Sequence, residues 1–271
     1  MSNTPRDRYT HGHHESVVQA HARRRADVEA WFLLPRLQPG MRLLDAGCGP
    51  GTVTAGLARA VAPGEVVGID VASGVLDHAR AHAADEGVEN VTFSEGDVYA
   101  LDHPDASFDV VYANQLLQHL TDPVRAIREM GRVLRPGGLL AVRDGDYATM
   151  SPSPKFPEFE DWNRLYHQTA YHNGAEPDAG RALPGWVRAA GFAEIELHPN
   201  VVALAGEEAR VWGRTWSQRI LYSSVADQAL EYGYATQADL DRLSNAWATW
   251  AESGSPFYMF AQVAVLAERR V

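Results

Sequence analysis

Cysteine is nearly absent from the sequence: Cys48 is the single one among 271 residues, which excludes an intramolecular disulfide. This scarcity fits a reducing compartment. Long apolar runs are absent too, because no stretch approaches the roughly 20 apolar residues that a membrane-spanning helix needs. Residues 1–14 are polar and lack the apolar segment of a signal peptide. We therefore expect a cytoplasmic protein without a membrane partner.

Positive charge is also scarce. The chain has 24 Lys and Arg residues against 35 Asp and Glu residues, which gives a formal net charge of −11. Such an excess repels nucleic acid, so we expect no nucleic-acid partner. The neighbouring His11, His13 and His14 invite a metal-site hypothesis, but no Cys or carboxylate cluster with ligand spacing accompanies them. We therefore expect no metal.

Residues 42–145 alternate short apolar runs with longer amphipathic ones, which predicts strands alternating with helices. The expected strands cover 42–45, 65–70, 91–93, 108–113 and 139–142. Helices are expected after the glycine-rich turn at 45–51, over 72–86, and from Pro123 to Leu134. This alternation predicts an α/β, Rossmann-like fold with a mostly parallel sheet and helices on both faces.

The pattern changes after Gly145. Prolines interrupt residues 151–157, further helical stretches follow, and 195–197 and 257–266 are typical of two more strands, seven in all. The sequence has no internal repeat, and nothing in it indicates a second domain. We expect one domain over 1–271, with an N-terminal helical cover at 1–38, a ligand-binding core at 40–145, and helical cap insertions at 147–180 and 207–254.

Aromatic residues gather in these cap insertions, since six of the seven tryptophans follow residue 160. An aromatic stripe at helical spacing is more often core than pocket, so we expect most of these rings in a packed core. The same rings could cover a partner chain, which leaves a homodimer open. The aromatic residues concerned are Phe159, Trp162, Tyr166, Trp212, Trp216, Trp247 and Trp250. The polar cap residues to test for substrate contact are Tyr166, His167, Tyr171, His172 and Arg181.

Ligand-binding residue types follow four consecutive strands of the expected sheet. A turn with three glycines, Asp45 to Gly51, ends the first strand, and Asp70, Asp97 and Asn114 end the next three. Glycine lacks a Cβ and so permits close approach of a ligand to the backbone. Ligands of such sheets bind beyond the carboxyl ends of the strands. Asp70 stands where a carboxylate can accept both hydroxyls of a ribose.

A dinucleotide is the rival ligand for this turn. Its fingerprint requires glycines at the first, third and sixth places. Gly47 and Gly49 fit, but Thr52 occupies the sixth place and Gly51 is additional. Asp45, two residues before the first glycine, suits a ligand with a positive amino group or sulfonium rather than a pyrophosphate.

These segments resemble class I S-adenosylmethionine-dependent methyltransferases, in the broad branch that contains quinone-biosynthesis and antibiotic or sugar methyltransferases. The matching segments are Leu43 to Gly51, Gly68-Ile69-Asp70, Gly96-Asp97-Val98, Phe108 to Val111, and Arg132 to Gly138. The resemblance covers about residues 40–145 and implies S-adenosylmethionine as cofactor.

The resemblance also implies which residues bind this cofactor. They are Asp45 and Cys48 in the turn, Gly47 and Gly49 behind the methionine moiety, Asp70 at the ribose, Val71 and Val98 around the adenine, Asp97 at its amino group, and Asn114 and Gln115 at the methionine end. Some of them have simpler alternatives. Val71 could be ordinary core, Asp97 could cap a helix, and Gly51 could serve only helix packing.

Methyl transfer from a sulfonium is an in-line displacement, so the protein mainly aligns the partners and, where needed, removes a proton. Some related sugar O-methyltransferases carry a His-His pair after the fourth strand and an Asp after the fifth. Here His119 and Asp144 are the catalytic candidates, although Gln118 replaces the first histidine. His119 could instead hold the helix start or touch substrate, and Asp144 could be a turn residue. Tyr9, His14 and Arg24 are candidates for contact with the methionine carboxylate or the substrate.

We therefore expect methyl transfer from S-adenosylmethionine to a small-molecule acceptor, a secondary metabolite or quinone-like compound. The fourth strand lacks an Asn-Pro-Pro-aromatic sequence, which argues against amino groups of adenine or cytosine as acceptors. A peptide or protein acceptor remains an alternative. Alternatives of other classes are an NAD-dependent oxidoreductase and a cofactor-binding protein without catalysis.

Overall fold

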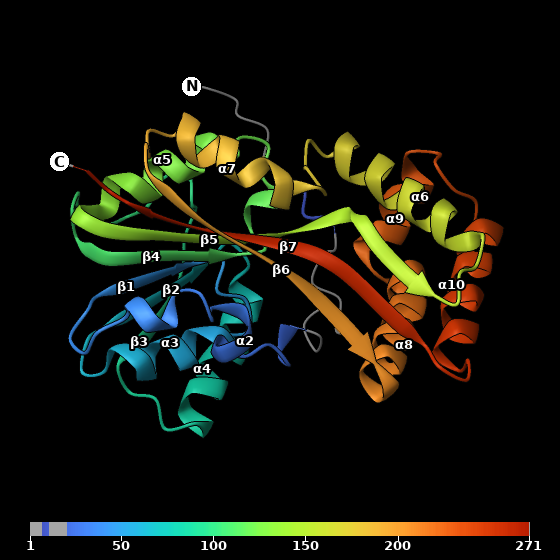
Figure 1. The fold of residues 1–271 in the computed structure, drawn as a ribbon, viewed down its shortest axis with the longest axis horizontal. Coiled ribbons are helices and arrows are strands. Elements are labelled where there is room, and N and C mark those ends of the chain that lie inside the picture. The colour runs from blue at the N-terminus through green and yellow to red at the C-terminus, as the bar shows by residue number, and fades with distance from the viewer. Residues whose placement is uncertain (1–6, 11–20, 271) are drawn as a thin grey trace.

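The computed structural model describes residues 7–10 and 21–270. Its centre is one seven-stranded sheet in the order β3-β2-β1-β4-β5-β7-β6 (Figure 1). The strands are β1 (Leu43–Ala46), β2 (Val66–Asp70), β3 (Val91–Glu95), β4 (Phe108–Asn114), β5 (Leu134–Ser153), β6 (Ile195–Ala205) and β7 (Phe257–Glu268). Strands β1 to β5 run parallel, and β7 is antiparallel to both β5 and β6. The predicted Rossmann-like, mostly parallel sheet is confirmed.

Helices cover both faces of the sheet, and each face has its own apolar core. One face packs against α5 (Pro123–Val133) and α7 (Ala179–Ala189). The other packs against α2 (Ala26–Glu29) and α3 (Thr52–Val61), with α4 (Ser73–Asp85) alongside. The helix α5 begins as its sequence predicts, because the Asp122 carboxylate accepts the Arg125 amide at 3.0 Å and Pro123 follows it.

Two strands, β5 and β6, are much longer than the sequence indicates, and together with β7 they extend the sheet beyond the core (Figure 1). The expected strand at 139–142 is part of the 20-residue β5, so Asp144 and Gly145 lie inside a strand rather than in a turn. Pairing with β7 resumes at Ser151 after an irregularity. Pro199 lies within β6, which tolerates it because β6 is the edge strand of the sheet.

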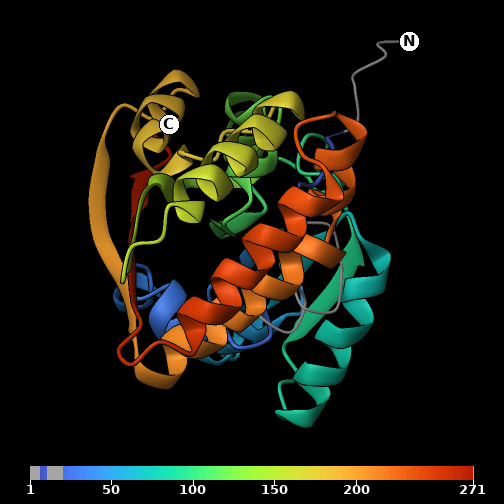
Figure 2. The same ribbon diagram turned by 90° about the vertical axis from the view of Figure 1, so that its right-hand side faces the viewer.

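The cap stands on this extension and consists of four helices, α6 (Glu158–His172), α8 (Gly206–Tyr222), α9 (Ser224–Glu231) and α10 (Gln237–Ala251). The expected helical stretch 207–252 is thus three helices, with a break at Ser223 and a capping box of Thr236 and Asp239 at the start of α10. Figure 2 shows α8 and α10 side by side. No helix among residues 7–10 and 21–270 is long and apolar enough to cross a membrane.

An aromatic core fills the interior of the cap, as the sequence predicts. Trp162, Trp216, Trp247 and Trp250 are each 2% exposed or less. Their rings meet one another at centroid distances such as 4.6 Å for Trp162 and Trp216. Because these rings cover one another, their abundance requires no partner chain, and a homodimer stays a prediction.

Candidate active site

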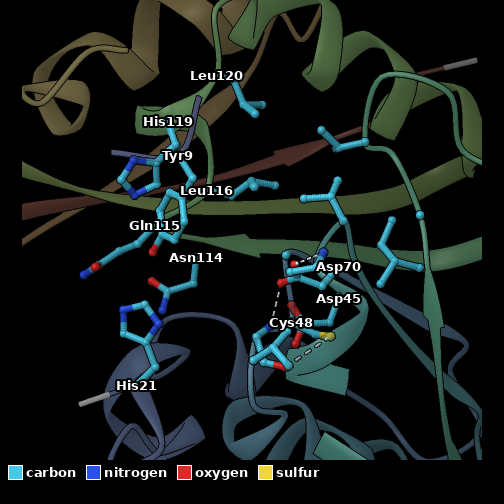
Figure 3. A pocket seen from close by; sticks show the side chains of 18 of the residues that line it. Tyr9, His21, Asp45, Cys48, Asp70, Asn114, Gln115, Leu116, His119 and Leu120 are labelled. Carbon is cyan, nitrogen blue, oxygen red and sulfur yellow. Dashed lines mark hydrogen bonds between the residues drawn. The ribbon is translucent and has the colours of Figure 1, made fainter. Parts of the chain in front are cut away.

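A cavity of about 890 Å³ lies at the carboxyl ends of β1 to β4. Figure 3 shows Asp45, Cys48 and Asp70 on one side of it, and Asn114, Gln115, Tyr9 and His119 on the other. All ten residues predicted to bind the cofactor line this one space. They are Asp45, Gly47, Cys48, Gly49, Asp70, Val71, Asp97, Val98, Asn114 and Gln115.

The glycines of the turn have different surroundings. A Cβ added to Gly49, whose φ is +51°, would meet nothing within 4 Å, so its backbone borders open space in the cavity. A Cβ on Gly51 would come within 2.7 Å of Ala79 Cβ on α4. Gly51 therefore allows α3 and α4 to pack closely, whereas Gly49 leaves room for a ligand.

The carboxylate of Asp70 is held by two backbone amides at the end of β2. Gly49 donates to Oδ2 and Ala72 donates to Oδ1, each at 3.0 Å. This ties the glycine turn to the neighbouring strand and fixes the direction of the carboxylate. The next residue, Val71, is 66% exposed and lines the cavity, so the alternative of an ordinary core residue is wrong. Asp97 also lines the cavity, and its carboxylate accepts the Tyr99 amide at 2.9 Å, which caps a local turn.

Asp45 is buried at the base of the cavity, with 2% of the residue exposed. Its carboxylate accepts a hydrogen bond from Thr54 Oγ1 at 2.7 Å. Burial raises the pKa of Asp45 to about 7, against the opposing effect of this hydrogen bond. A positively charged group placed beside it would favour the ionised form.

A charged network holds the residues that end β4. Arg24 donates to Gln115 Oε1 at 2.6 Å, and Asn114 Nδ2 donates to Glu29 at 3.1 Å. Glu29 also pairs with the buried Arg143. Although burial acts to raise it, the pKa of Glu29 lies below its ordinary value because the Arg143 and Arg24 guanidiniums are close. The network orients both cavity-lining amides.

Glu29 and Arg143 were not predicted as parts of the site. The signal for Arg143 is in the sequence, because a charged residue interrupts the apolar strand that begins at Leu139. Such a residue in a central strand needs a buried partner. Its partner Glu29 precedes it by more than a hundred residues, which no local pattern reveals. In the run of three arginines at 23–25, Arg23 and Arg25 are exposed, whereas Arg24 lines the cavity.

His119, one of the two catalytic candidates, lines the cavity from the 3₁₀ helix η2 (Leu117–His119). Its ring lies edge-to-face against Tyr9 at 4.7 Å, and Nε2 is 3.2 Å from Gln118 Nε2. Burial, aided by the charge of Arg24, lowers the pKa of His119 to about 3. The imidazole is therefore uncharged at neutral pH.

Asp144, the other catalytic candidate, does not line the cavity. It lies within β5 and is 1% exposed. Neither carboxylate oxygen has a hydrogen bond of good geometry within the described part of the chain. Burial raises its pKa to about 8, and the nearby amides of Gln118 and Leu117 only partly oppose this. The strand continues past Asp144 and encloses it beneath η2, so the carboxyl group does not reach the cavity.

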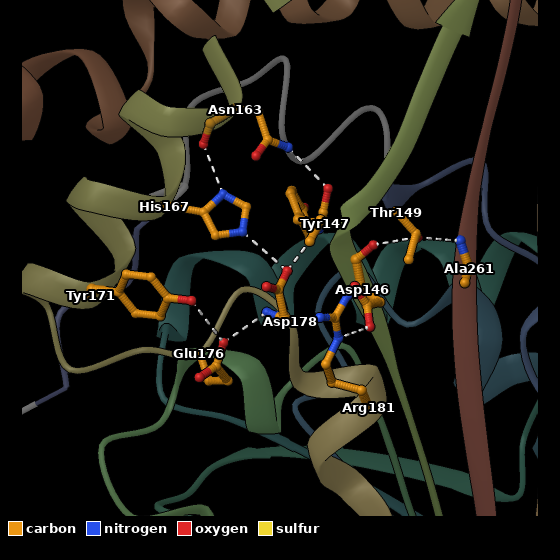
Figure 4. Close-up of polar contacts among 11 residues, drawn as sticks. Asp146, Tyr147, Thr149, Asn163, His167, Tyr171, Glu176, Asp178, Arg181 and Ala261 are labelled. Carbon is orange, nitrogen blue, oxygen red and sulfur yellow. Dashed lines mark hydrogen bonds and ion pairs between the residues drawn. The ribbon is translucent and has the colours of Figure 1, made fainter. Parts of the chain in front are cut away.

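The polar cap residues proposed for substrate contact lie elsewhere (Figure 4). His167 bridges Asn163 O at 2.7 Å and Asp178 Oδ1 at 3.0 Å, and Arg181 binds Asp146 through two contacts of 2.6 Å. Tyr166, Tyr171 and His172 are likewise absent from the lining of the cavity. The contact of His167 joins α6 to the residue that precedes α7, and the contact of Arg181 joins α7 to β5, so both hold the cap in place.

The N-terminal segment 7–10 contributes Asp7 and Tyr9 to the lining of the cavity. The Asp7 carboxylate accepts the Thr121 amide at 2.8 Å, and Arg8 pairs with Glu231 of α9 at 2.6 Å. Tyr9 lines the cavity, while its carbonyl accepts from Gln228 at 3.2 Å. The candidates His11, His13 and His14 lie outside the described residues, as do positions 1–6 and 11–20 of the expected cover at 1–38. Within residues 7–10 and 21–270, no group of three or more His, Cys, Asp or Glu side chains is placed to hold a metal.

Comparison with known proteins identifies the family. The family described as a methyltransferase domain matches residues 37–219. An uncharacterized methyltransferase of Schizosaccharomyces pombe is 34% identical over 93% of this chain and 93% of its own length. The 27-O-demethylrifamycin SV methyltransferase of Amycolatopsis mediterranei is 32% identical over 83% of this chain and 78% of its own. A putative methyltransferase from Bacillus halodurans shares the fold, with a TM-score of 0.60 and 18% identity over 91% of this chain and 100% of the other.

These matches set aside the NAD-dependent and non-catalytic alternatives. They also agree with the cavity at the carboxyl ends of the strands, where the glycine turn, Asp70 and Asn114 meet. S-adenosylmethionine is the methyl donor. The chain belongs to the methyltransferase-domain family and is a class I S-adenosylmethionine-dependent methyltransferase.

Proposed function

We propose that the protein methylates a small molecule, a secondary metabolite or quinone-like compound, at the end of the cavity formed by Tyr9, His119 and Leu120. The observation that carries this proposal is the position of Tyr9, which lines this end of the cavity while its segment, 7–10, is attached to α9. A cavity of about 890 Å³ falls within the range of small-molecule sites. A folded protein would need an open surface at this place. The name of the rifamycin methyltransferase, at 32% identity, supports the same acceptor class.

In this proposal, different residues of the cavity bind different parts of the cofactor. Asp70 accepts the ribose hydroxyls, and Val71 and Val98 enclose the adenine, whose amino group Asp97 binds. The backbone at Gly47 to Gly49 lies behind the methionine moiety. Asp45 faces its positive charge, and the 2%-exposed carboxylate is ionised by that charge despite burial. When bound, S-adenosylmethionine supplies a methyl group already activated by the sulfonium.

Arg24, Asn114 and Gln115 complete the methionine end. Arg24 supplies a positive charge for the methionine carboxylate while it donates to Gln115 Oε1. Asn114 is held from behind by Glu29 and Arg143. The amides are therefore positioned before the cofactor arrives, which reduces the cost of ordering them on binding.

We assign His119 to positioning of the acceptor rather than to proton removal. A general base works best with a pKa near the operating pH, and a pKa of about 3 makes His119 a weak proton acceptor. Burial raises the pKa of Tyr9 to about 12, so its hydroxyl stays protonated and can donate a hydrogen bond. The two rings, 4.7 Å apart, would fix the acceptor in line with the methyl group.

The test is methyl transfer from radiolabelled S-adenosylmethionine to two fractions of one cell extract, low-molecular-weight compounds and proteins. Label in the small-molecule fraction that disappears with Tyr9→Ala supports the proposal. Exclusive labelling of proteins or peptides would overturn it in favour of the alternative acceptor class. Asp77→Ala serves as the control, because Asp77 is exposed on α4 and pairs with Arg80 away from the cavity.

A further inference from the structure

The cap helices contact the active-site cavity only indirectly in the described part of the chain, because every described residue that lines the cavity lies at or before Arg125. Segment 7–10 connects the two regions. It is attached to the cap, while the ring of its Tyr9 lies in the cavity beside His119, 4.7 Å between ring centroids. The way in which the cap holds this segment therefore bears on the acceptor end of the cavity.

A chain of hydrogen bonds leaves the N-terminal segment and returns to it through the cap. Arg8 donates to the Tyr232 hydroxyl at 2.7 Å, and this hydroxyl donates to Asn173 Oδ1 at 2.7 Å. Asn173 Nδ2 donates to Gln228 Oε1 at 2.7 Å, and Gln228 Nε2 donates to the Tyr9 carbonyl oxygen at 3.2 Å. The chain therefore binds the backbone of Tyr9 at one end and the side chain of the preceding residue at the other.

Asn173 is the junction of this chain. It follows α6 directly and is 9% exposed. Its Nδ2 donates both to Gln228 and to Thr10 Oγ1, the latter at 3.1 Å, while its Oδ1 accepts from Tyr232. Since Nδ2 carries two hydrogens, this orientation of the amide uses both of them. Thr10 and Gln228 are at most 2% exposed, so solvent does not substitute for these bonds.

These buried bonds fix three successive residues, Arg8, Tyr9 and Thr10, each through a directed contact with the cap. The ion pair of Arg8 with Glu231 contributes little by itself, because its side chains are 45% and 56% exposed. Apolar packing would also attach the segment, but it is not directional. A buried network that satisfies its polar groups specifies one arrangement. The network therefore gives the ring of Tyr9 one place beside the cavity.

We propose that Asn173 and Gln228 are positioning residues for methyl transfer, which act from outside the cavity by holding Tyr9 beside His119. This inference rests on the proposed function, in which the two rings fix the acceptor in line with the methyl group. Misplacement of a positioning group by about 1 Å can cost roughly 100-fold in rate. The cap thereby sets the geometry of the acceptor end through α9 and the end of α6.

Gln228→Met tests this assignment, because it keeps the approximate length of the side chain and removes both hydrogen bonds. Transfer from radiolabelled S-adenosylmethionine is measured well below the Tm of both proteins, on whichever fraction of a cell extract the wild type labels. We expect the rate to fall about 10- to 100-fold, while the affinity for S-adenosylhomocysteine changes less than about threefold. Gln237→Met is the matched control and should leave the rate unchanged, because Gln237 is exposed on α10 and bonds Asp241 at the surface.

A double-mutant comparison separates positioning from a structural role. In a Tyr9→Phe background, Gln228→Met should reduce the rate clearly less than in the wild type, because the hydroxyl that Gln228 helps to place is already missing. Its effect on the Tm should be similar in both backgrounds. A wild-type rate despite a lower Tm would show a structural role and overturn the proposal, as would equal rate losses in both backgrounds. Labelling confined to proteins would count against the proposed function, while the variants would still be compared on that fraction.

Hydrogen–deuterium exchange examines the same contact without turnover. Peptides that cover segment 7–10 should exchange faster in Gln228→Met than in the wild type or in Gln237→Met, because the Gln228 side chain binds the Tyr9 carbonyl. Equal exchange in the three proteins would also overturn the proposal.

Discussion

Two regions of the molecule are built on different physical principles: the carboxyl ends of β1 to β4, called the cofactor edge from here on, and the cap. The cofactor edge depends on backbone features and short side chains: a glycine turn, an aspartate held by two amides, and strand ends in register. The cap depends on large rings that bury one another and on α6, α8, α9 and α10, which pack on the extended strands. Short-range constraints fix the first region, whereas mutual burial fixes the second.

This difference bears on function. The edge can bind one cofactor with little dependence on which acceptor is used, because its contacts come from turns and strand ends. The cap, by contrast, can change its aromatic rings and the buried charge of Arg219 in α8 without disturbing those turns. We infer that donor recognition resides in the edge and acceptor choice in the cap, which the following predictions separate.

The largest expected effect follows from Trp247→Ala in the cap. Trp247 is 1% exposed and contacts Phe159 at 4.5 Å and Trp162 at 5.2 Å between ring centroids. The resulting cavity should lower the free energy of unfolding by about 3–5 kcal/mol, measured by urea denaturation. The affinity for S-adenosylmethionine should change by less than about threefold, about 0.7 kcal/mol. Trp31→Ala, at a 40%-exposed ring, is the control and should cost less than about 1 kcal/mol. A cofactor affinity that falls with Trp247→Ala would show that the regions are not separable.

The sequence predicts the cofactor edge well because turns and strand ends, which local patterns reveal, form this edge. The turn at 45–51, Asp70, Asp97 and Asn114 are placed by strand ends, and alternation of strands and helices sets their register. The cap is predicted in composition but not in form. The extension of β5 to Ser153 depends on pairing with β7, which is more than a hundred residues away in the sequence. Gly145 in β5 and Pro199 in β6 are residues typical of turns, so the sequence predicts that each strand ends early.

Buried charges were the hardest part to predict. Arg219 and Glu29 look like ordinary surface residues in sequence, since only the tertiary fold encloses them. Arg143 interrupts an apolar strand, but nothing in the sequence identifies its partner. Asp144 was predicted beside the ligand because it stood near the expected end of a strand. The strand continues, and the carboxyl group is enclosed beneath η2. The division into N-terminal cover, core and cap insertions stays a prediction.

The second-largest effect is expected at the cofactor edge, on the affinity for S-adenosylmethionine. Asp70→Ala removes a charged acceptor that two backbone amides hold in place. The loss of charge-assisted hydrogen bonds to a ribose should weaken S-adenosylmethionine binding by about 2–3 kcal/mol, roughly 30- to 150-fold, in calorimetry. The Tm of the Asp70→Ala variant should fall far less than the Tm of Trp247→Ala. Asp77→Ala, which removes an exposed carboxylate from neighbouring α4, should leave the affinity unchanged. Equal losses in both variants would mean that general charge, and not the position of Asp70, governs binding.

The last effect, which is the smallest when taken per pH unit, concerns Asp144, in the strand that passes from the edge into the cap. Its folded-state pKa of about 8 exceeds the ordinary value of 3.8, so the folded protein retains a proton that the unfolded chain has lost between about pH 4 and pH 8. Stability should therefore fall as pH rises through this window, by up to about 1.4 kcal/mol per pH unit.

Asp144→Asn keeps the shape and removes this titration, so its advantage over the wild type in urea denaturation should grow from pH 5 to pH 8. Asp45, with a pKa of about 7, and His119, with a pKa of about 3, remain in both proteins and cancel in the comparison. The exposed Asp77→Asn should show no such trend. A difference that stays constant with pH would mean that Asp144 is ionised in the fold. The junction of edge and cap would then hold a buried anion, and the contrast between an edge built on polar strand ends and a cap built on packed rings would have to include Asp144.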